Sequence, residues 1–505
     1  MAKRGEVLSG VRTVTCGELA CHIQGCLVGD GDVRLRGLTH DSRQVHPGDI
    51  FVCIPGARFD GHDFAPAAVA QGAAALIVER LLTLPVPQIV VPGSRGVLGE
   101  AAALLAGFPS RHLRVIGVTG TKGKTTTTYL IRHVLESAGK KAGLIGTIEH
   151  VAGSQTLPSA RTTPEASDIQ TLLSAMVEAE WDAVVMEVSS HATEMRRTDG
   201  TEFDVAVFTN ITRDHMDFHP NFEHYLQAKL RLFAQIGVDG TKGNKAAIVN
   251  VDDPHWRDFA RAARVPVITV GIDNQADLRA EDVQVSAAGS FFRIGDVSVD
   301  LELTGRFNVY NALCALAAGI HEGIPLEVAA GALERVRGVP GRFERIDIGQ
   351  EFAVIVDYAH TEDSLRNVLT TARDLGSGRV ISVCGAGGDR DRGKRPLMGR
   401  ALAELSDHVI ITSDNPRSES PEQICADMVS GIQRINRTNY EVILDRRAAI
   451  EKAMEIAQSG DVVLIAGKGH ETYQQFADHR IHFDDREEAR AALEKRKRTR
   501  RTETS

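Results

Sequence analysis

Short apolar runs alternate with longer stretches of mixed polar and apolar residues along most of the chain, a pattern that predicts strands followed by helices. Near the beginning, apolar runs at 49–54 and 74–78 flank a helical pattern at 65–71. The segment 107–110, Gly-Phe-Pro-Ser, has the composition of a linker. We therefore expect residues 1–109 to form a small N-terminal α/β domain.

The stretch 110–338 continues the alternation, with a helical pattern after Lys124. Strand-and-helix alternation of this kind is typical of a parallel sheet with helices on both faces. Ligands of such sheets bind at the carboxyl ends of the strands. The predicted strands of this central domain are 115–118, 183–188, 205–209 and 246–251.

A second boundary is expected at Gly338–Gly341, where glycine and proline cluster. Residues 339–490 then repeat the strand-and-helix pattern, and this pattern predicts a C-terminal Rossmann-like domain. The segment contains no phosphate loop of its own. The fold class is thus α/β with three domains. The strands expected in the third domain are 353–356, 379–384, 408–412, 441–444 and 462–466.

The composition and net charge limit the classes of protein to which the chain can belong. The chain has 505 residues, 43% hydrophobic and 25% charged, as is ordinary for soluble globular proteins. A net charge of −9 argues against nucleic acid as a partner. The basic run 495–501 is interpreted as part of a disordered tail, residues 491–505, in preference to a binding arm.

The expected location is the cytoplasm. The first ten residues, MAKRGEVLSG, lack the apolar core of a signal peptide. No stretch reaches the ~18 uninterrupted apolar residues of a membrane span. The seven cysteines form no recognisable disulfide or zinc pattern and are expected to be reduced.

The segment 118–126, Val-Thr-Gly-Thr-Lys-Gly-Lys-Thr-Thr, lies between a predicted strand and a predicted helix. Backbone N–H groups and the helix dipole at such a turn form a polyphosphate site. Lys124 can reach the terminal phosphates, and the Thr125 hydroxyl suits magnesium. Val118 stands where the strict phosphate-loop pattern has glycine, so a glycine-rich turn without a ligand is the alternative. We predict ATP binding.

Further polar residues follow the strands of the central domain. Glu187 ends the apolar run 183–186, where a magnesium ligand is needed beside a phosphate loop. The segment 210–217 follows another strand and contains His215, and Lys229 lies on the helix after it. Each of these could be structural if taken alone. Their joint placement at strand ends favours a site.

In the third domain, three polar loops follow predicted strands: 385–392, 414–417 and 467–471. Loops from adjacent strand ends converge on one pocket. They would bring Arg390, Arg417 and Glu471 together, which suits a ligand with both carboxylate and ammonium groups. The alternative is that all three loops are simple turns.

Six motifs together make the chain similar to the Mur ligase family, which builds the peptide stem of peptidoglycan. Their order and spacing agree across nearly the whole chain. Within the family, the segments 41–43, 162–164 and 414–417 resemble those of the members that add the third residue. The six motifs are 119–127, 187–191, 210–217, 305–311, 341–344 and 357–361.

The resemblance implies site residues by position. The residues implied for ATP binding are Gly120, Thr121, Lys122, Gly123, Lys124, Thr125, Thr126, Asn308, Arg342 and Asp357. Those implied for magnesium are Thr125, Glu187, His215 and Lys229 as a carbamate. The residues implied to be catalytic are Lys124, Glu187, His215 and Lys229. For the UDP-linked substrate they are Ser42, Thr162, Thr163, Ser189 and Arg197; for diaminopimelate, Arg390, Asp414, Asn415, Pro416, Arg417, Gly467 and Glu471. Lys122, Arg161 and Thr193 depart from the usual Asn, Asn and Leu.

The implied activity is ATP-dependent amide formation. It would join meso-diaminopimelate to the D-Glu γ-carboxylate of UDP-N-acetylmuramoyl-L-Ala-D-Glu through an acyl phosphate, with Mg²⁺, in a monomer without nucleic-acid or membrane partners. The closest rival is the same ligation with L-lysine, which has no distal carboxylate for Arg417. The other rivals are a phosphate-loop kinase and a non-enzymatic nucleotide switch.

Overall fold

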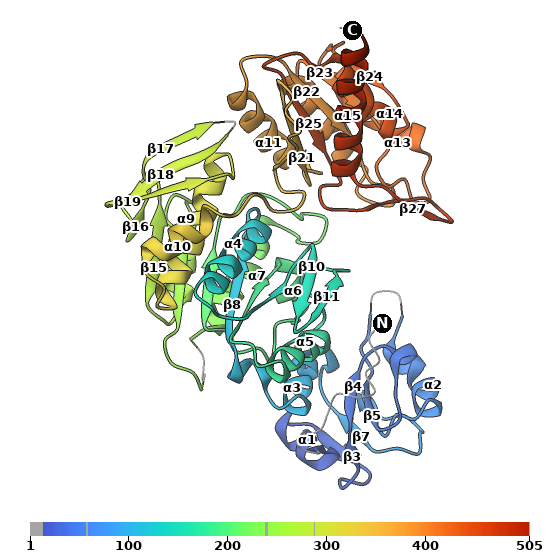
Figure 1. Cartoon of the computed structure of the whole chain (residues 1–505). Coiled ribbons are helices and arrows are strands. Elements are labelled where there is room, and N and C mark those ends of the chain that lie inside the picture. Colours follow the sequence, from blue (N-terminus) through green and yellow to red (C-terminus); the bar gives the residue numbers. More distant parts are fainter. Residues whose placement is uncertain (1–13, 57–58, 238–240, 287, 504–505) are drawn as a thin grey trace. The chain divides into compact units, whose positions relative to one another are not determined.

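The computed structural model describes residues 14–503 except 57–58, 238–240 and 287. The described chain forms two compact units (Figure 1). Unit 1 contains the residues up to Arg279 together with Tyr310–Ala329. Unit 2 contains Ala280–Val309 and the residues from Ala330 onward. Helices α9 (Arg306–His321) and α10 (Leu326–Leu333) therefore each contribute residues to both units.

Unit 1 begins with a five-stranded sheet in the order β2-β7-β6-β5-β4. Strands β4 to β7 pair in parallel, and β2 is antiparallel to β7. Every residue of β5 and β6 is buried, as their apolar runs require. The elements are β1 Val14–Thr15, α1 Cys16–His22, β2 Cys26–Val28, β3 Arg34–Leu35, β4 Gly37–Thr39, η1 Ser42–Gln44, β5 Asp49–Val52, η2 Gly61–Phe64, α2 Ala65–Ala70, β6 Ala75–Val78, β7 Gln88–Val90, α3 Ser94–Leu105 and η3 Pro109–His112.

The larger sheet of unit 1 has nine strands in the order β11-β10-β9-β12-β8-β13-β14-β15-β16. Its strands pair in parallel from β9 to β16, and the hairpin β10–β11 adds an antiparallel edge. The elements are β8 Arg114–Thr119, α4 Lys124–Ser137, β9 Ala142–Ile145, β10 Glu149–Ala152, β11 Gln155–Pro158, α5 Ala166–Glu178, β12 Ala183–Glu187, α6 Ser190–Glu194, β13 Val205–Phe208, α7 Phe222–Gln235, β14 Ala246–Asn250, α8 Trp256–Ala262, β15 Val267–Gly271 and β16 Leu278–Arg279.

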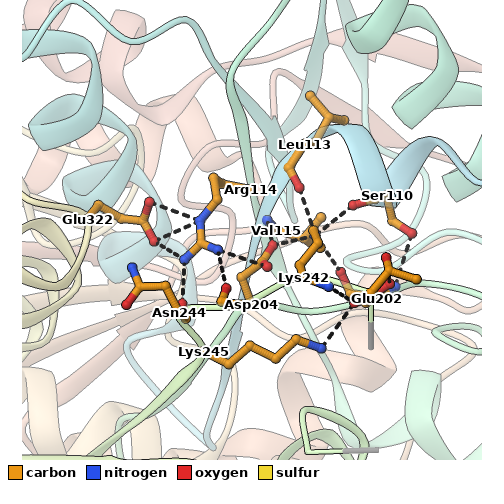
Figure 2. A network of polar contacts seen from close by, with 12 residues as sticks. Ser110, Leu113, Arg114, Val115, Glu202, Asp204, Lys242, Asn244, Lys245 and Glu322 are labelled. Atoms are coloured by element: carbon orange, nitrogen blue, oxygen red, sulfur yellow. Dashed lines mark hydrogen bonds and ion pairs between the residues drawn. The ribbon is translucent and has the colours of Figure 1, made fainter. Parts of the chain in front are cut away.

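A buried polar network fixes the amino-end edge of this sheet (Figure 2). Arg114, the first residue of β8, donates to Asp204 at 2.9 Å and to Glu322 at 2.6 Å. Asp204 precedes β13 and accepts from the Val115 N–H at 2.7 Å and from Lys242 at 2.5 Å. Burial raises the pKa of Asp204 and lowers that of Lys242. The network joins the starts of two strands to the end of α9, at the edge opposite the phosphate loop.

Unit 2 contains a six-stranded sheet in the order β20-β21-β25-β22-β23-β24, parallel except for β20. It also contains an antiparallel sheet, β17-β18-β19, and a hairpin, β26–β27. The elements are β17 Glu281–Ser286, β18 Gly289–Ile294, β19 Val297–Leu301, β20 Glu344–Arg345, β21 Ala353–Asp357, α11 Glu362–Leu375, β22 Val380–Cys384, α12 Lys394–Leu405, β23 His408–Ile411, α13 Pro421–Gln433, β24 Tyr440–Val442, α14 Arg446–Ile456, β25 Val462–Ala466, β26 Tyr473–Gln475, β27 Arg480–His482 and α15 Asp485–Glu503.

The six-stranded sheet has a hydrophobic core on each face. Leu464 packs with residues of α11, α12 and α13, whereas its neighbours Val463 and Ile465 pack with residues of α14 and α15. Successive side chains of a strand point to opposite faces, so a continuous apolar run such as β25 is buried on both. This confirms the doubly wound architecture that the sequence predicts.

Two parts of the chain differ from the sequence prediction. Residues 491–503, expected to be a disordered tail, form the second half of α15. Arg496 lies over the Phe352 ring at 4.8 Å and donates to the carbonyl of Ala457 at 2.6 Å, so this residue of the basic run packs against the domain. The sheet β17-β18-β19 was not predicted, because its first strand, Glu-Asp-Val-Gln-Val-Ser, is mostly exposed and has no continuous apolar run. Within the described residues, no helix is both long and apolar enough to span a membrane.

Candidate active site

The turn between β8 and α4 has the backbone geometry of a phosphate loop. Gly123 has φ +83°, in the left-handed region, and a Cβ there would lie 2.3 Å from Oδ1 of Asn311. A Cβ on Gly120 would lie 2.0 Å from the Thr209 hydroxyl oxygen, so neither glycine can be replaced without strain. Helix α4 has no side-chain cap, which leaves its first turn suited to an anion.

Two lysines converge on this loop. Nζ of Lys124 donates to the carbonyls of Gly120 at 2.9 Å and Thr121 at 3.0 Å, and Nζ of Lys229 donates to the same Gly120 carbonyl at 2.7 Å. Lys229 is 1% exposed. Burial first, and then the Lys124 charge, holds the pKa of Lys229 well below its usual value. A lowered pKa favours the neutral amine, which is the form that reacts with carbon dioxide to give a carbamate.

Glu187, the last residue of β12, is a buried carboxylate beside the phosphate loop. Its oxygens accept hydrogen bonds from neutral groups: the Thr125 hydroxyl at 3.0 Å, and the Thr147 N–H and hydroxyl at 2.7 and 3.1 Å. A carboxylate buried among neutral donors next to a threonine hydroxyl fits a hard divalent cation such as Mg²⁺. Thr125 and Glu187 would hold that ion.

His215 lies on the loop after β13, with φ +56°. Its ring centroid is 4.8 Å from that of His191 and 6.2 Å from that of Tyr225, whose hydroxyl pairs with the Thr121 hydroxyl at 2.9 Å. Of the four predicted catalytic residues, Lys124 belongs to the phosphate loop, Glu187 and Lys229 contact it directly, and His215 is connected to it through Tyr225. Among the described residues, no group of three or more His, Cys, Asp and Glu has the geometry of a metal site. A cation here needs further ligands, such as a carbamate and phosphate oxygens.

Four of the predicted UDP-substrate residues are linked to Glu187. The Thr162 hydroxyl pairs with the Thr147 hydroxyl at 3.0 Å. The Thr163 hydroxyl donates to the Glu187 carbonyl at 2.8 Å and accepts from the Ser189 N–H at 3.2 Å, while Arg197 donates to the Thr163 carbonyl at 3.2 Å. The fifth, Ser42, begins the short helix η1, which Asp41 caps.

The other nucleotide residues belong to unit 2. Asn308 is 2% exposed and donates to the Thr304 carbonyl at 2.8 Å. The Arg342 guanidinium lies over the ring of Tyr358 at 4.7 Å. Asp357, at the end of β21, accepts from the N–H groups of Phe343 at 2.7 Å and Ala359 at 2.8 Å.

The three polar loops of unit 2 do converge. The Gly388 N–H donates to the Asn415 carbonyl at 2.9 Å, and Arg417 donates to the Gly388 carbonyl at 2.6 Å. A Cβ on Gly467 would lie 2.6 Å from Oδ2 of Asp414. Asn415 donates to Glu471 at 2.7 Å. Pro416, which lies between Asn415 and Arg417 in the sequence, is buried. Arg390 is exposed and donates to the Asp389 carbonyl at 3.0 Å.

Lys468 supplies a buried positive charge to these loops, and the sequence analysis missed it. Its ammonium lies 3.4 Å from Oε2 of Glu471, 3.9 Å from Oδ1 of Asp414 and 3.3 Å from Oδ1 of Asn415. Burial would raise the pKa of Asp414, but the charges of Lys468 and Arg446 outweigh it and lower that pKa. Burial and Asp414 raise the pKa of Glu471. Two carboxylates around one ammonium leave a negative charge that suits a ligand ammonium.

Thr147 was also missed, since no motif marks it. It follows β9, the strand next to β12, and its role becomes visible only when the two strands are paired. Lys468 could have been found, because it lies between Gly467 and Glu471 in a segment already singled out.

Comparison with known proteins agrees with this geometry. Three family models match the chain: "Mur ligase family, catalytic domain" over residues 34–105, "Mur ligase middle domain" over 118–319 and "Mur ligase, glutamate ligase domain" over 341–469. The chain belongs to the Mur ligase family. The family assignment expected from the motifs and the three-domain α/β fold expected from the strand-and-helix pattern are thereby confirmed.

Two relatives among those matched are named UDP-N-acetylmuramoyl-L-alanyl-D-glutamate–2,6-diaminopimelate ligase. The Syntrophomonas wolfei protein is 47% identical over 92% of this chain and 95% of its own length. The Geobacillus thermodenitrificans protein is also 47% identical, over 92% of this chain and 96% of its own length. A solved structure of a ligase with the same name is 35% identical, with TM-score 0.68 over 96% of this chain and 99% of that one.

Proposed function

We propose that this Mur ligase is the enzyme that adds meso-diaminopimelate to UDP-N-acetylmuramoyl-L-Ala-D-Glu, with ATP as co-substrate. The observation that carries the proposal is the joint presence of a phosphate loop tied to Glu187 and a separate, charged amino-acid site around Asp414 and Glu471. A kinase or a nucleotide switch needs the first site but has no use for the second. Relatives that cover nearly the whole chain bear the name of this ligase.

The first half of the reaction is phosphoryl transfer from ATP to the γ-carboxylate of D-Glu, which gives an acyl phosphate and ADP. The loop N–H groups and Lys124 bind the phosphates and stabilise the charge on the transferred group. Thr125, Glu187, His215 and carbamylated Lys229 would hold magnesium, which neutralises phosphate charge when bound. Thr162, Thr163, Ser189 and Arg197, together with Ser42, would orient the acceptor.

In the second half, the diaminopimelate amine attacks the acyl carbon to form a tetrahedral intermediate. The bond to the phosphate oxygen then breaks, phosphate leaves and the amine loses a proton, so that an amide remains. Asp414 and Glu471 attract the ammonium groups of the amino acid, and Arg417 pairs with its distal carboxylate. Asn308, Arg342 and Asp357 would contact the nucleotide, and Arg390, Asn415, Pro416 and Gly467 would complete the amino-acid site.

The proposal also covers the location, the oligomeric state, the metal ion and the substrate preference of the enzyme. The enzyme would act as a cytoplasmic monomer with Mg²⁺ and without nucleic-acid or membrane partners. L-Lysine would be a poor substrate, because it would leave Arg417 in the closed site without its anion.

An end-point assay of the purified protein tests the proposal. The protein is incubated with ATP, Mg²⁺ and UDP-N-acetylmuramoyl-L-Ala-D-Glu, with diaminopimelate, lysine or no amino acid, and both ADP and the UDP-linked product are measured. We expect a tripeptide product of the mass given by diaminopimelate addition, and ADP release that requires the acceptor. ADP release at full rate without the acceptor would contradict the proposal.

A further inference from the structure

Three guanidinium groups surround the single carboxylate of Glu165. Nη1 of Arg161 lies 2.6 Å from Oε1, and Nε of Arg197 lies 3.0 Å from the same oxygen. Nη1 of Arg95 lies 3.1 Å from Oε2. We call these four residues the Glu165 cluster.

The cluster is assembled from distant parts of unit 1. Arg95 lies in the first turn of α3, Glu165 is the N-cap of α5, and Arg197 follows α6. Helix α3 is packed so closely that a Cβ on Gly99 would lie 2.2 Å from the Asp199 carbonyl. Backbone packing of α3 against Asp199, two residues after Arg197, therefore helps to hold Arg95 near Arg197.

The charges of the cluster do not balance. Glu165 and Arg197 are buried, with side chains 8% and 9% exposed, whereas Arg95 and Arg161 are 36% and 55% exposed and reach the solvent side. One carboxylate neutralises one guanidinium, which leaves two positive charges. The pKa of Arg197 is lowered, first by burial and then by the positive charges of Arg161 and Arg95. The negative charge of Glu165 acts to raise it but does not outweigh them. A second anion would relieve this repulsion.

The position of the cluster indicates which anion. Arg197 donates to the Thr163 carbonyl at 3.2 Å, and the Thr163 hydroxyl donates to the Glu187 carbonyl at 2.8 Å. Only Thr163 therefore separates the cluster from Glu187. Under the proposed function, Glu187 lies where the γ-carboxylate of the acceptor meets the phosphoryl donor. The part of the acceptor at that place is its D-Glu end, which carries two carboxylates, and only one of them reacts.

We propose that Arg95 and Arg161 act with Arg197 to bind the non-reacting α-carboxylate of the acceptor's D-Glu residue. Binding this carboxylate turns the γ-carboxylate toward the phosphate loop and so determines which of the two is activated. Arg95 and Arg161 are thus specificity-determining residues in addition to those assigned above. The inference rests on the proposed function.

Two acceptors and a matched control variant test the inference. The acceptors are UDP-N-acetylmuramoyl-L-Ala-D-Glu and its D-isoglutamine analogue, in which the α-carboxylate is an amide. The variants are Arg95→Gln, Arg161→Gln and Arg161→Lys. The control is Arg196→Gln, because Arg196 is also 55% exposed and pairs with one carboxylate, Asp199, at 2.6 Å. KM for each acceptor, KM for ATP and kcat are measured for every protein.

We expect Arg161→Gln and Arg95→Gln each to raise KM for the native acceptor roughly tenfold, the effect of losing one charge-assisted hydrogen bond. KM for ATP should stay unchanged, Arg161→Lys should recover part of the loss, and Arg196→Gln should behave as the unmutated enzyme. With the D-isoglutamine analogue the Gln variants should show no penalty relative to the unmutated enzyme, since the partner of the two arginines is absent.

Two outcomes overturn the inference. An equal penalty with both acceptors would assign the arginines to another anion of the acceptor, such as its diphosphate. Unchanged KM in both Gln variants would show that the cluster is only structural. Failure of the proposed function is distinguishable, because the unmutated protein would then form no amide with the native acceptor.

Discussion

The hydroxyl of Thr125 donates a 3.0 Å hydrogen bond to Oε2 of Glu187. Thr125 lies in the first turn of α4 and Glu187 at the end of β12, so this contact joins the phosphate loop to the neighbouring strand end. Thr147 donates to both oxygens of the same carboxylate from a third segment. The carboxylate is therefore held in one orientation by groups that carry no charge.

Glu187→Gln should abolish most of the ligase activity while leaving the fold intact. The amide keeps the size of the side chain but removes the charge that holds a divalent cation. We expect kcat to fall by about 10²-fold or more and the Mg²⁺ concentration for half-maximal activity to rise. Initial rates over a Mg²⁺ series measure both. Glu178→Gln, at an exposed position of α5, is the control and should keep full activity.

Lys229 should carry a carbamate in the active enzyme. A protonated lysine would place positive charge beside the metal and Lys124, whereas the neutral amine, which the lowered pKa of this buried group favours, can take up carbon dioxide. ¹³C NMR after incubation with ¹³C-bicarbonate should give a carbamate signal that Lys229→Ala lacks. Lys229→Ala should be nearly inactive and partly rescued by a short carboxylic acid at high concentration. A fully active enzyme without the signal would rule the carbamate out.

His219 should make the protein less stable as the pH falls from about 6.5 to 4. It is fully buried, its Nε2 lies 2.9 Å from the Ser190 hydroxyl, and burial together with the charge of His191 lowers its pKa to about 4. Below pH 6.5 the unfolded state binds a proton that the folded state does not, so stability present at neutral pH is lost. The loss amounts to about 3 kcal/mol by pH 4.

Urea unfolding at several pH values measures this slope. His219→Gln removes the titrating group, so its free energy of unfolding should depend less on pH over the same interval. His112→Gln, at an exposed position, should leave the slope unchanged. The same slope in His219→Gln as in the unmutated protein would assign the acid sensitivity to other groups.

The sequence predicts well what periodicity and strand ends determine. Buried parallel strands such as β8 and β25 read as continuous apolar runs, and Glu187 is found because it ends one of them. The convergence of loops on Asp414 and Glu471 follows from the same rule about strand ends.

Residues that act through pairing between distant elements were not predictable in this way. The contact between Thr147 and Glu187 depends on the β9–β12 register, and Arg95 meets Glu165 only because α3 packs against α5. The end of α15 was misjudged for a similar reason. Charge density indicates disorder, whereas the burial of Phe352 under Arg496 is a tertiary contact that composition does not reveal.

Arg417 should carry the preference for diaminopimelate over lysine. Its backbone is fixed by a 3.0 Å hydrogen bond from its N–H to the Gln475 carbonyl, in the hairpin β26–β27, and its guanidinium is held by the Gly388 carbonyl. The two amino acids differ at the distal carbon, which bears a carboxylate only in diaminopimelate. A guanidinium can hold that carboxylate through two parallel hydrogen bonds, and a site built this way rejects an analogue lacking the group by ~10⁴-fold.

Arg417→Ala should therefore lower kcat/KM for diaminopimelate sharply and leave the weak lysine activity little changed. Arg417→Lys should recover only a small part, because an ammonium pairs with a carboxylate as a point charge and not as a planar fork. Arg392→Ala is the matched control: Arg392 belongs to the same group of loops, is 70% exposed and pairs with Glu419 at 2.9 Å. Both kcat/KM values should be unchanged in that variant. Equal use of lysine and diaminopimelate by the unmutated enzyme would contradict the substrate assignment, while amide formation with either amino acid would still support the ligase.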